Sequence, residues 1–194
     1  MLATNLQPFL MGIAVSVLVG IALTLPISSA AICAAFGLTG LAGGAAVAGC
    51  CAQMVGFAVM SFKENRWGGL VSQGIGTSML QMGNIIKNPR IWIAPIVTSA
   101  ITGPMATCLF KLQMNGTPVS SGMGTCGFVG QIGVYSGWVN DIANGTKAAI
   151  TGFDWTGMIL ISFILPAVLC PLINMLLNTV SYTHLRAHET DQYL

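Results

Sequence analysis

The sequence predicts an all-α, polytopic membrane protein, a helical bundle with re-entrant, Gly-rich hairpins. Charged residues make up 6% of the 194 residues, whereas a soluble domain carries roughly 25%. Apolar residues reach 54%, and no Lys, Arg, Asp, Glu or His occurs from Met1 to Phe62. An uncharged apolar stretch of that length exceeds any buried core helix and needs lipid around it. The net charge of +2 is too small to indicate a nucleic-acid partner.

The first part of the chain predicts closely packed spans. Residues 9–25 are long enough for one span, and Pro26 marks its end. Residues 27–62 exceed one span of roughly 20 residues, so we expect two shorter spans that break near Gly43 and Gly44. The region is rich in Gly, Ala, Ser and Cys, which let helix backbones approach each other inside a bilayer.

The middle of the chain alternates charged loops with broken segments. A charged loop at residues 63–66 is expected on the cytoplasmic side. Residues 70–86 are rich in Gly and amides and predict a re-entrant hairpin rather than a span. Residues 91–110 predict a span that is interrupted at Gly103 and Pro104.

The later elements follow the same pattern. Residues 119–139 form a second Gly-rich segment, and residues 157–177 predict the last span, with Pro166 and Pro171 inside it. Each tryptophan lies close to a charged residue, and indole rings favour the headgroup level, so we expect each to mark a membrane boundary. These tryptophans are Trp67, Trp92, Trp138 and Trp155.

The end of the chain differs in composition from the rest. Residues 180–194 hold both histidines, His184 and His188, among several charged residues. The string resembles translated sequencing-adapter sequence, although a short soluble cytoplasmic tail has a similar composition. We therefore assign residues 1–179 to one transmembrane domain and treat residues 180–194 as an adapter-like or disordered tail outside the fold.

Two stretches share a G-x-G-T motif, Gly74–Thr77 and Gly122–Thr125, and each is followed by a glutamine. Backbone that leaves a helix inside a bilayer is tolerated only where protein or a polar cavity satisfies its polar groups. Paired Gly-interrupted segments therefore indicate a transporter's binding site, although such glycines can also serve only tight helix crossings. The candidate solute-binding residues are glycines, hydroxyls and amides: Gln73, Gly76, Thr77, Ser78, Gln81, Asn84, Asn88, Gly124, Thr125 and Gln131.

The sequence predicts no catalytic site, metal site or cofactor. It has no paired carboxylates within a span and no Ser-His-Asp set. The six cysteines form no C-x-x-C pair, and no His or carboxylate accompanies them. We therefore expect neither a metal site nor a disulfide framework.

Three runs of residues resemble one family. They are residues 74–96 (GIGTSMLQMGNIIKNPRIWIAPI), residues 99–111 (SAITGPMATCLFK) and residues 122–133 (GMGTCGFVGQIG). Together they resemble the enzyme IIC family of the phosphotransferase system (PTS), in the branch of sugar permeases and perfringolysin-regulator-like membrane proteins. The resemblance covers nearly all of residues 9–180. Because family members carry further spans before the position of Met1, it implies that the chain is a fragment.

The resemblance implies a multi-pass permease subunit of the bacterial plasma (inner) membrane, surrounded by lipid and forming a homodimer. Such a subunit binds a sugar and presents it to the cytoplasmic enzyme IIB, which receives phosphate from enzyme IIA. Relatives place a carboxylate and often a histidine at the sugar site. The segment from Gly74 to Asn88 contains neither, so amides and hydroxyls are the expected sugar ligands.

Two other functions stay open from these residues. The same fold can serve as a membrane-embedded regulator of toxin and virulence gene expression, which senses a solute without transporting it. An unrelated channel is the third possibility. A channel would need a pore lined by charged residues or carbonyls, and the sequence shows no charge ring.

Overall fold

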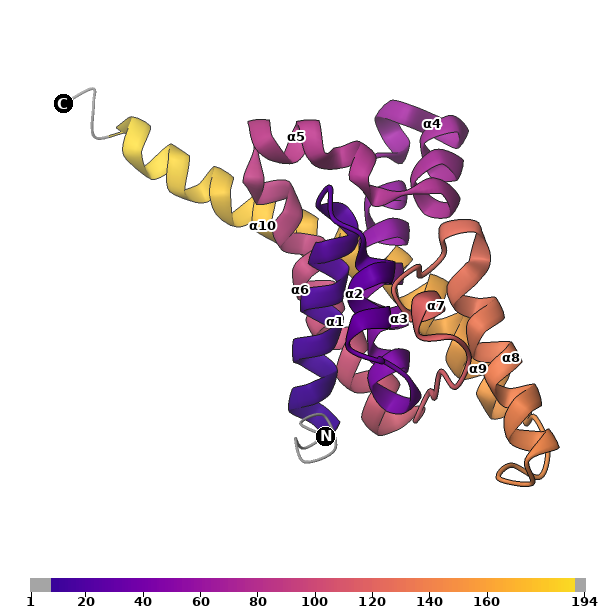
Figure 1. Ribbon diagram of the computed structural model, residues 1–194. Helices are drawn as coiled ribbons and strands as arrows, with labels where there is room; N and C mark the ends of the chain where they lie inside the picture. Colours follow the sequence, from indigo (N-terminus) through magenta and orange to yellow (C-terminus); the bar gives the residue numbers. More distant parts are fainter. Residues whose placement is uncertain (1–7, 191–194) are drawn as a thin grey trace.

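The computed structural model describes the backbone of residues 8–190 and the side chains of residues 8–178. Within that part every regular element is helical (Figure 1), and the expected all-α membrane fold is confirmed. Three helical stretches are long and apolar enough to cross a membrane: Gly40–Met60, Pro89–Leu109 and Gly152–Asn178. The helix over the first predicted span, Pro8–Thr24, is also apolar but shorter.

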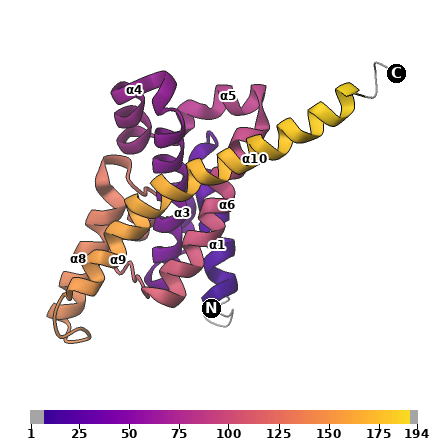
Figure 2. The ribbon, with the colours of Figure 1, turned by 180° about the vertical axis from the view of Figure 1, so that it is seen from behind.

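Helix α3 (Gly40–Met60) is the central element of the bundle. Helices α1 (Pro8–Thr24), α6 (Ile93–Pro104) and α10 (Leu165–Thr190) all pack against it. Seen from behind, α10 crosses the bundle diagonally over α3 and α6 (Figure 2). Nearly every residue of α3 is buried, and most of its residues are Gly, Ala or Cys. Small side chains let several helices approach one helix closely, which is how helices associate within a bilayer.

The break expected near Gly43 and Gly44 is wrong, because both glycines lie inside α3. The chain instead turns between α2 (Ser29–Ala35) and α3, where Gly37 and Gly40 have positive φ angles of +59° and +61°. A Cβ added at Gly43 would lie 3.1 Å from the Cβ of Met114. These two glycines therefore make room for a neighbouring chain segment and do not interrupt the helix.

Two spans contain a proline next to a π-helical turn, and neither span is broken there. Helix α6 ends at Pro104 and continues directly into a π-helical turn, η5 (Met105–Leu109). Helix α9 (Gly152–Ile159) likewise continues through the π-helical turn η7 (Leu160–Ile164) into α10, just before Pro166. A proline lacks the backbone N–H of a regular helical turn, and in both spans the proline lies next to a π-helical turn through which the helix continues. The last span consequently begins at Gly152, earlier than predicted.

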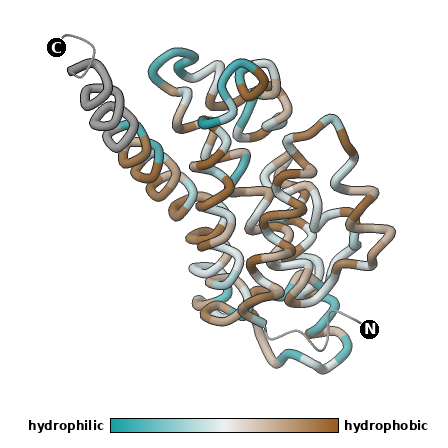
Figure 3. Tube along the Cα trace, turned by 90° about the vertical axis from the view of Figure 1, so that its left-hand side faces the viewer, coloured by the Kyte–Doolittle hydropathy of each residue, from teal (hydrophilic) through white to brown (hydrophobic). Residues whose placement is uncertain are grey.

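The remaining elements cover one end of the molecule and the side of the bundle that leads to the other end (Figure 1). One end holds α4 (Phe62–Val71), η2 (Ser72–Gly76), η3 (Ser78–Gln81), α5 (Met82–Lys87) and η4 (Pro89–Trp92). After residues 110–117 come α7 (Pro118–Ser121), η6 (Cys126–Phe128) and α8 (Val129–Ala143), which leads to the loop 144–151 at the opposite end (Figure 1). Hydrophilic stretches gather at both ends, with mostly hydrophobic chain between them (Figure 3).

The assignment of residues 180–194 to a separate tail stays a prediction. The backbone of residues 180–190 continues helix α10. The side chains beyond Asn178, and residues 191–194 altogether, lie outside the described part of the chain.

Candidate functional site

The two G-x-G-T motifs lie against each other in the fold. The hydroxyl of Thr125 donates a hydrogen bond of 2.5 Å to the carbonyl oxygen of Gly74, and Thr125 is fully buried. Gly124 has a φ of +53°, and a Cβ at this position would lie 2.6 Å from the Cβ of Cys50 on α3. One motif thus satisfies an exposed carbonyl of the other, which is how broken backbone is tolerated within a membrane protein.

A buried polar cluster joins the residue after the first motif, Ser78, to α1, to α3 and to the start of the span Pro89–Leu109. Ser78 Oγ lies 2.9 Å from Thr24 Oγ1, and Thr24 donates a 3.3 Å bond to Gln53 Oε1. The indole Nε1 of Trp92 donates to the same oxygen at 3.1 Å. An indole N–H can only donate, so it fixes the orientation of the Gln53 amide. Gln53 Nε2 then has no hydrogen-bond partner among the described residues.

A cavity of about 410 Å³ lies between α3, α4, α5 and α10, and we call it the inner pocket. Its volume falls in the range of roughly 300–1,000 Å³ that is typical of small-ligand sites. The lining combines a few apolar side chains with amides, one hydroxyl and one carboxylate. These residues are Phe57, Met60, Ser61, Glu64, Asn65, Gln81, Asn84, Ile91, Asn174 and Asn178.

The polar groups of the inner pocket suit a ligand with many hydroxyls. Asn84 Nδ2 donates a 2.9 Å hydrogen bond to Gln81 Oε1, which orients both amides. Each amide still offers donors and acceptors, and the Glu64 carboxylate adds acceptors only. A sugar hydroxyl both donates and accepts, so a lining of this composition can satisfy several hydroxyls together.

Some of the predicted site residues gather at the inner pocket. Gln81 and Asn84 line it, and Gln73 lies next to it, because Ser61 in the lining donates a 3.3 Å bond to Gln73 Oε1. Ser78 is buried in the polar cluster around Gln53.

The other predicted residues lie elsewhere. The Thr77 hydroxyl accepts the N–H of Met79, and the side-chain Oδ1 of Asn88 accepts the N–H of Arg90, so both side chains hold local turns. Gly76 is exposed, while Gly124 and Thr125 form the contact between the motifs. Gln131 is on α8 and donates a 3.3 Å bond to Cys51 Sγ; its Oε1 has no hydrogen-bond partner among the described residues.

Sequence reasoning missed most of the polar lining. Glu64 and Asn65 lie in the predicted charged loop, Asn174 lies in the predicted last span, and Ser61 and Asn178 were not singled out. One signal was available: two amides four residues apart on a membrane helix share one face. Polar groups within a membrane span are costly and commonly functional. The approach of α4 to that face could not be predicted from spacing.

The two ends of the molecule differ in charge. The end with α4 and α5 has four basic residues and one acidic residue, a net charge of +3: Lys63, Glu64, Arg66, Lys87 and Arg90. At the opposite end two lysines and two aspartates cancel: Lys111, Asp141, Lys147 and Asp154. Basic residues favour the cytoplasmic side of a membrane, so this asymmetry favours the inner pocket facing the cytoplasm.

Comparison with known protein families identifies one that the chain matches over most of its length. The family model described as "Phosphotransferase system, EIIC" matches residues 1–188. No curated protein and no solved structure matches the chain. The match spans nearly the whole chain and confirms the resemblance at the level of the family, while the regulator-like branch stays a prediction.

Proposed function

The chain belongs to the EIIC family of the phosphotransferase system, and on that premise we propose that it binds a sugar in the inner pocket and presents it to phosphorylated enzyme IIB. Family membership makes it a membrane component of a sugar phosphotransferase system. The observation that carries the proposal is the joining of Glu64 with the amides of Gln81 and Asn84 around one polar cavity. Homodimer formation and multi-pass insertion in the bacterial inner membrane belong to the same proposal.

The Glu64 carboxylate changes the expected set of sugar ligands. The Gly74–Asn88 segment contains no carboxylate, but the fold brings Glu64 of α4 to the same cavity as Gln81. Hydrogen bonds to an ionised acceptor are roughly twice as strong as those between neutral groups. Glu64 is therefore our candidate for the strongest sugar contact, and the amides supply the donors and acceptors around it.

The position of the inner pocket suits transfer of phosphate from a cytoplasmic partner. It is bounded by α4 and α5, at the basic end of the molecule. Basic residues at this end also favour approach of a partner that carries a phosphoryl group. In this proposal the reacting phosphate comes from enzyme IIB, and the residues of this chain bind and orient the sugar.

Phosphoenolpyruvate-dependent sugar uptake tests the proposal. We expect the full-length gene to support uptake of at least one sugar, and Glu64→Gln to raise KM about tenfold, since it removes a charge-assisted hydrogen bond of roughly 1.5–3 kcal/mol. Gly83→Ala is the control, because Gly83 is exposed beside Asn84, lies outside the lining, and a Cβ there would contact nothing within 4 Å. Absence of uptake of any sugar, with altered toxin transcription on deletion, would contradict transport and favour regulation.

A further inference from the structure

A second cavity, of about 370 Å³, lies at the opposite end of the molecule, between α8, α9 and the segment 110–115. We call it the outer pocket. Its volume also falls in the range of roughly 300–1,000 Å³ typical of small-ligand sites. Its polar lining includes Lys111, Gln113, Trp138, Asp141, Lys147 and Asp154.

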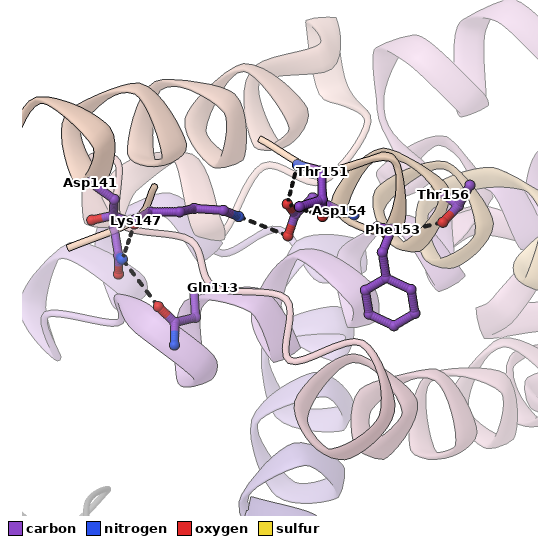
Figure 4. A network of polar contacts seen from close by, with 8 residues as sticks. Gln113, Asp141, Lys147, Thr151, Phe153, Asp154 and Thr156 are labelled. Carbon is purple, nitrogen blue, oxygen red and sulfur yellow. Dashed lines mark hydrogen bonds and ion pairs between the residues drawn. The ribbon is translucent and has the colours of Figure 1, made fainter. Parts of the chain in front are cut away.

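Two of the four charges in the outer pocket are already paired with each other. Lys147 Nζ lies 2.7 Å from Asp154 Oδ1 (Figure 4). It also lies 5.1 Å from the centre of the Trp138 ring. The other oxygen of Asp154 accepts the backbone N–H of Thr151 at 2.8 Å and its hydroxyl at 2.7 Å. This set holds the start of α9 against α8, and it neutralises the charge of Lys147 and uses most of the acceptor capacity of Asp154.

The remaining polar groups have capacity for a ligand. Asn115 Nδ2 donates a 2.7 Å bond to Asp141 Oδ2, so the second carboxylate oxygen stays available as an acceptor. The same amide approaches Gln113 Oε1 at 3.4 Å, which leaves the donors of Gln113 available. Lys111 is exposed and lines the cavity. These three groups offer both donors and acceptors, with one positive and one negative charge.

This charge balance favours a neutral ligand. An anion such as a lipid phosphate would meet Asp141, and a cation would meet Lys111. A polyhydroxylated molecule needs neighbouring donors and acceptors and is not repelled by either charge. The apolar wall of the cavity includes the aromatic ring of Phe110. Aromatic carbon can cover the apolar faces of a sugar ring, while polar groups fix its hydroxyls.

The outer pocket is built from backbone that is already ordered. The carbonyl oxygen of Asp141 accepts the N–H groups of Thr146 and Lys147 at 2.9 and 3.1 Å, and the Thr146 hydroxyl at 2.8 Å. Lys111 has a φ of +46°, which a side-chain-bearing residue rarely adopts. Such strain persists where surrounding contacts impose it and is common at ligand sites. An ordered lining loses little conformational entropy when it binds.

We propose that the outer pocket is a capture site for a neutral sugar on the face opposite the inner pocket, with Lys111, Gln113 and Asp141 as its ligands. The proposal rests on the proposed function, because it takes the captured molecule to be the transported sugar. It assigns a second binding site to the chain. This site lies at the end opposite the basic residues of α4 and α5, and the positive-inside rule favours that end facing outside the cell.

Equilibrium dialysis of the purified full-length gene product tests this site apart from the inner pocket. The probes are radiolabelled glucose, galactose, fructose and cellobiose, and the starting protein carries Glu64→Gln to weaken the inner pocket. We expect one probe to bind this starting protein. Its association constant should fall about tenfold when Gln113→Ala or Asp141→Asn is introduced as well, because each substitution removes a hydrogen bond to the ligand. Asn140→Ala is the matched control, since Asn140 is exposed on α8 outside the lining.

The outcomes separate this inference from the proposed function. The capture-site proposal is overturned if the starting protein binds no probe. It is also overturned if neither Gln113→Ala nor Asp141→Asn reduces the binding that remains. Co-purified phospholipid that is lost in Asp141→Asn also overturns it, in favour of a lipid site. Gel filtration of the two variants, which leave the Lys147–Asp154 pair intact, checks that they fold. Failure of the proposed function is measured separately, as absent uptake by the wild-type protein.

Discussion

Glycines in this chain act mainly by letting backbone approach backbone. Gly44 packs against the carbonyl of Leu112, and Gly49 packs against the carbonyl of Ser16 on α1. A methyl group at either position would overlap those atoms. Such contacts bring α1 and the segment 110–115 against α3, and they explain why nearly all of α3 is buried.

Gly124 and Gly127 offer a matched pair of substitutions. Both have positive φ angles, +53° and +52°, so each change to Ala costs roughly 1–2 kcal/mol in backbone strain. Only at Gly124 does the new Cβ meet α3, at 2.6 Å from Cys50 Cβ, whereas at Gly127 its nearest contact is Val129 at 3.8 Å. We therefore expect Gly124→Ala to lower the Tm clearly more than Gly127→Ala, measured by thermal unfolding in detergent. An equal loss in both variants would mean that strain alone matters.

The depth of the tryptophans in the membrane stays a prediction, whereas their orientation in the fold differs from one to another. Trp67 and Trp155 are exposed, as boundary residues are expected to be, but Trp138 is only 2% exposed and Trp92 hydrogen-bonds to Gln53. A neighbouring charge indicates the level in the membrane, because that depends on position along the chain. Whether the ring faces lipid or protein depends on which helix packs beside it, and one sequence does not contain that information.

At the scale of elements, the sequence shows that the G-x-G-T motif occurs twice and predicts broken backbone at both copies. It does not predict that the two copies contact each other. The prediction rested on a repeated local pattern, which indicates broken backbone. The contact between Thr125 and Gly74 joins residues far apart in the chain and depends on how η2 and η6 pack. Gln131 follows the second motif as Gln81 follows the first, but it lies on a regular helix, away from the inner pocket.

The Thr125 hydroxyl provides a test of this contact. Thr125→Val keeps the shape of the side chain but removes the donor and leaves the Gly74 carbonyl unpaired, whereas Thr125→Ser keeps the donor. We expect Thr125→Val to destabilise the segment Ser72–Gln81 by about 1–3 kcal/mol and Thr125→Ser to have a much smaller effect. Hydrogen exchange of the segment is the measurement. Equal protection in both variants would show that the hydroxyl does not hold the motifs together.

At the scale of the whole molecule, low charge predicts the membrane fold, and the few charges that remain predict its orientation. Counting only the side chains that the structure describes, the end with α4 and α5 carries +3 and the charges at the opposite end cancel. The inner pocket is a property of the whole fold, because it combines α3, α4, η3, α5, η4 and α10. Its amides on η3 and α5 were predicted from sequence and the spacing of Asn174 and Asn178 offered a signal, whereas the approach of Glu64 depends on how α4 packs.

Orientation can be measured with single cysteines and a membrane-impermeant maleimide. Gly83 and Ala148 are exposed and lie at opposite ends of the molecule, and a Cβ at Gly83 would contact nothing within 4 Å. We expect Ala148→Cys to react in intact spheroplasts and Gly83→Cys to react only in inside-out vesicles. Serine replaces the native cysteines that are not buried, Cys108 and Cys126, in both variants. The reverse pattern would place the inner pocket outside the cell.

The central claim is that the transported sugar binds in the inner pocket. Alkylation of Asn84→Cys and Asn174→Cys tests it directly in the same serine background at Cys108 and Cys126, because both positions line the cavity. Gly83→Cys is the control on the same helix as Asn84 but outside the lining. We predict that saturating transported sugar slows maleimide reaction at both lining positions about tenfold, and leaves Gly83→Cys unchanged, since a bound ligand covers most of its site. Unchanged alkylation at both lining positions, in variants that still take up the sugar, would contradict the account.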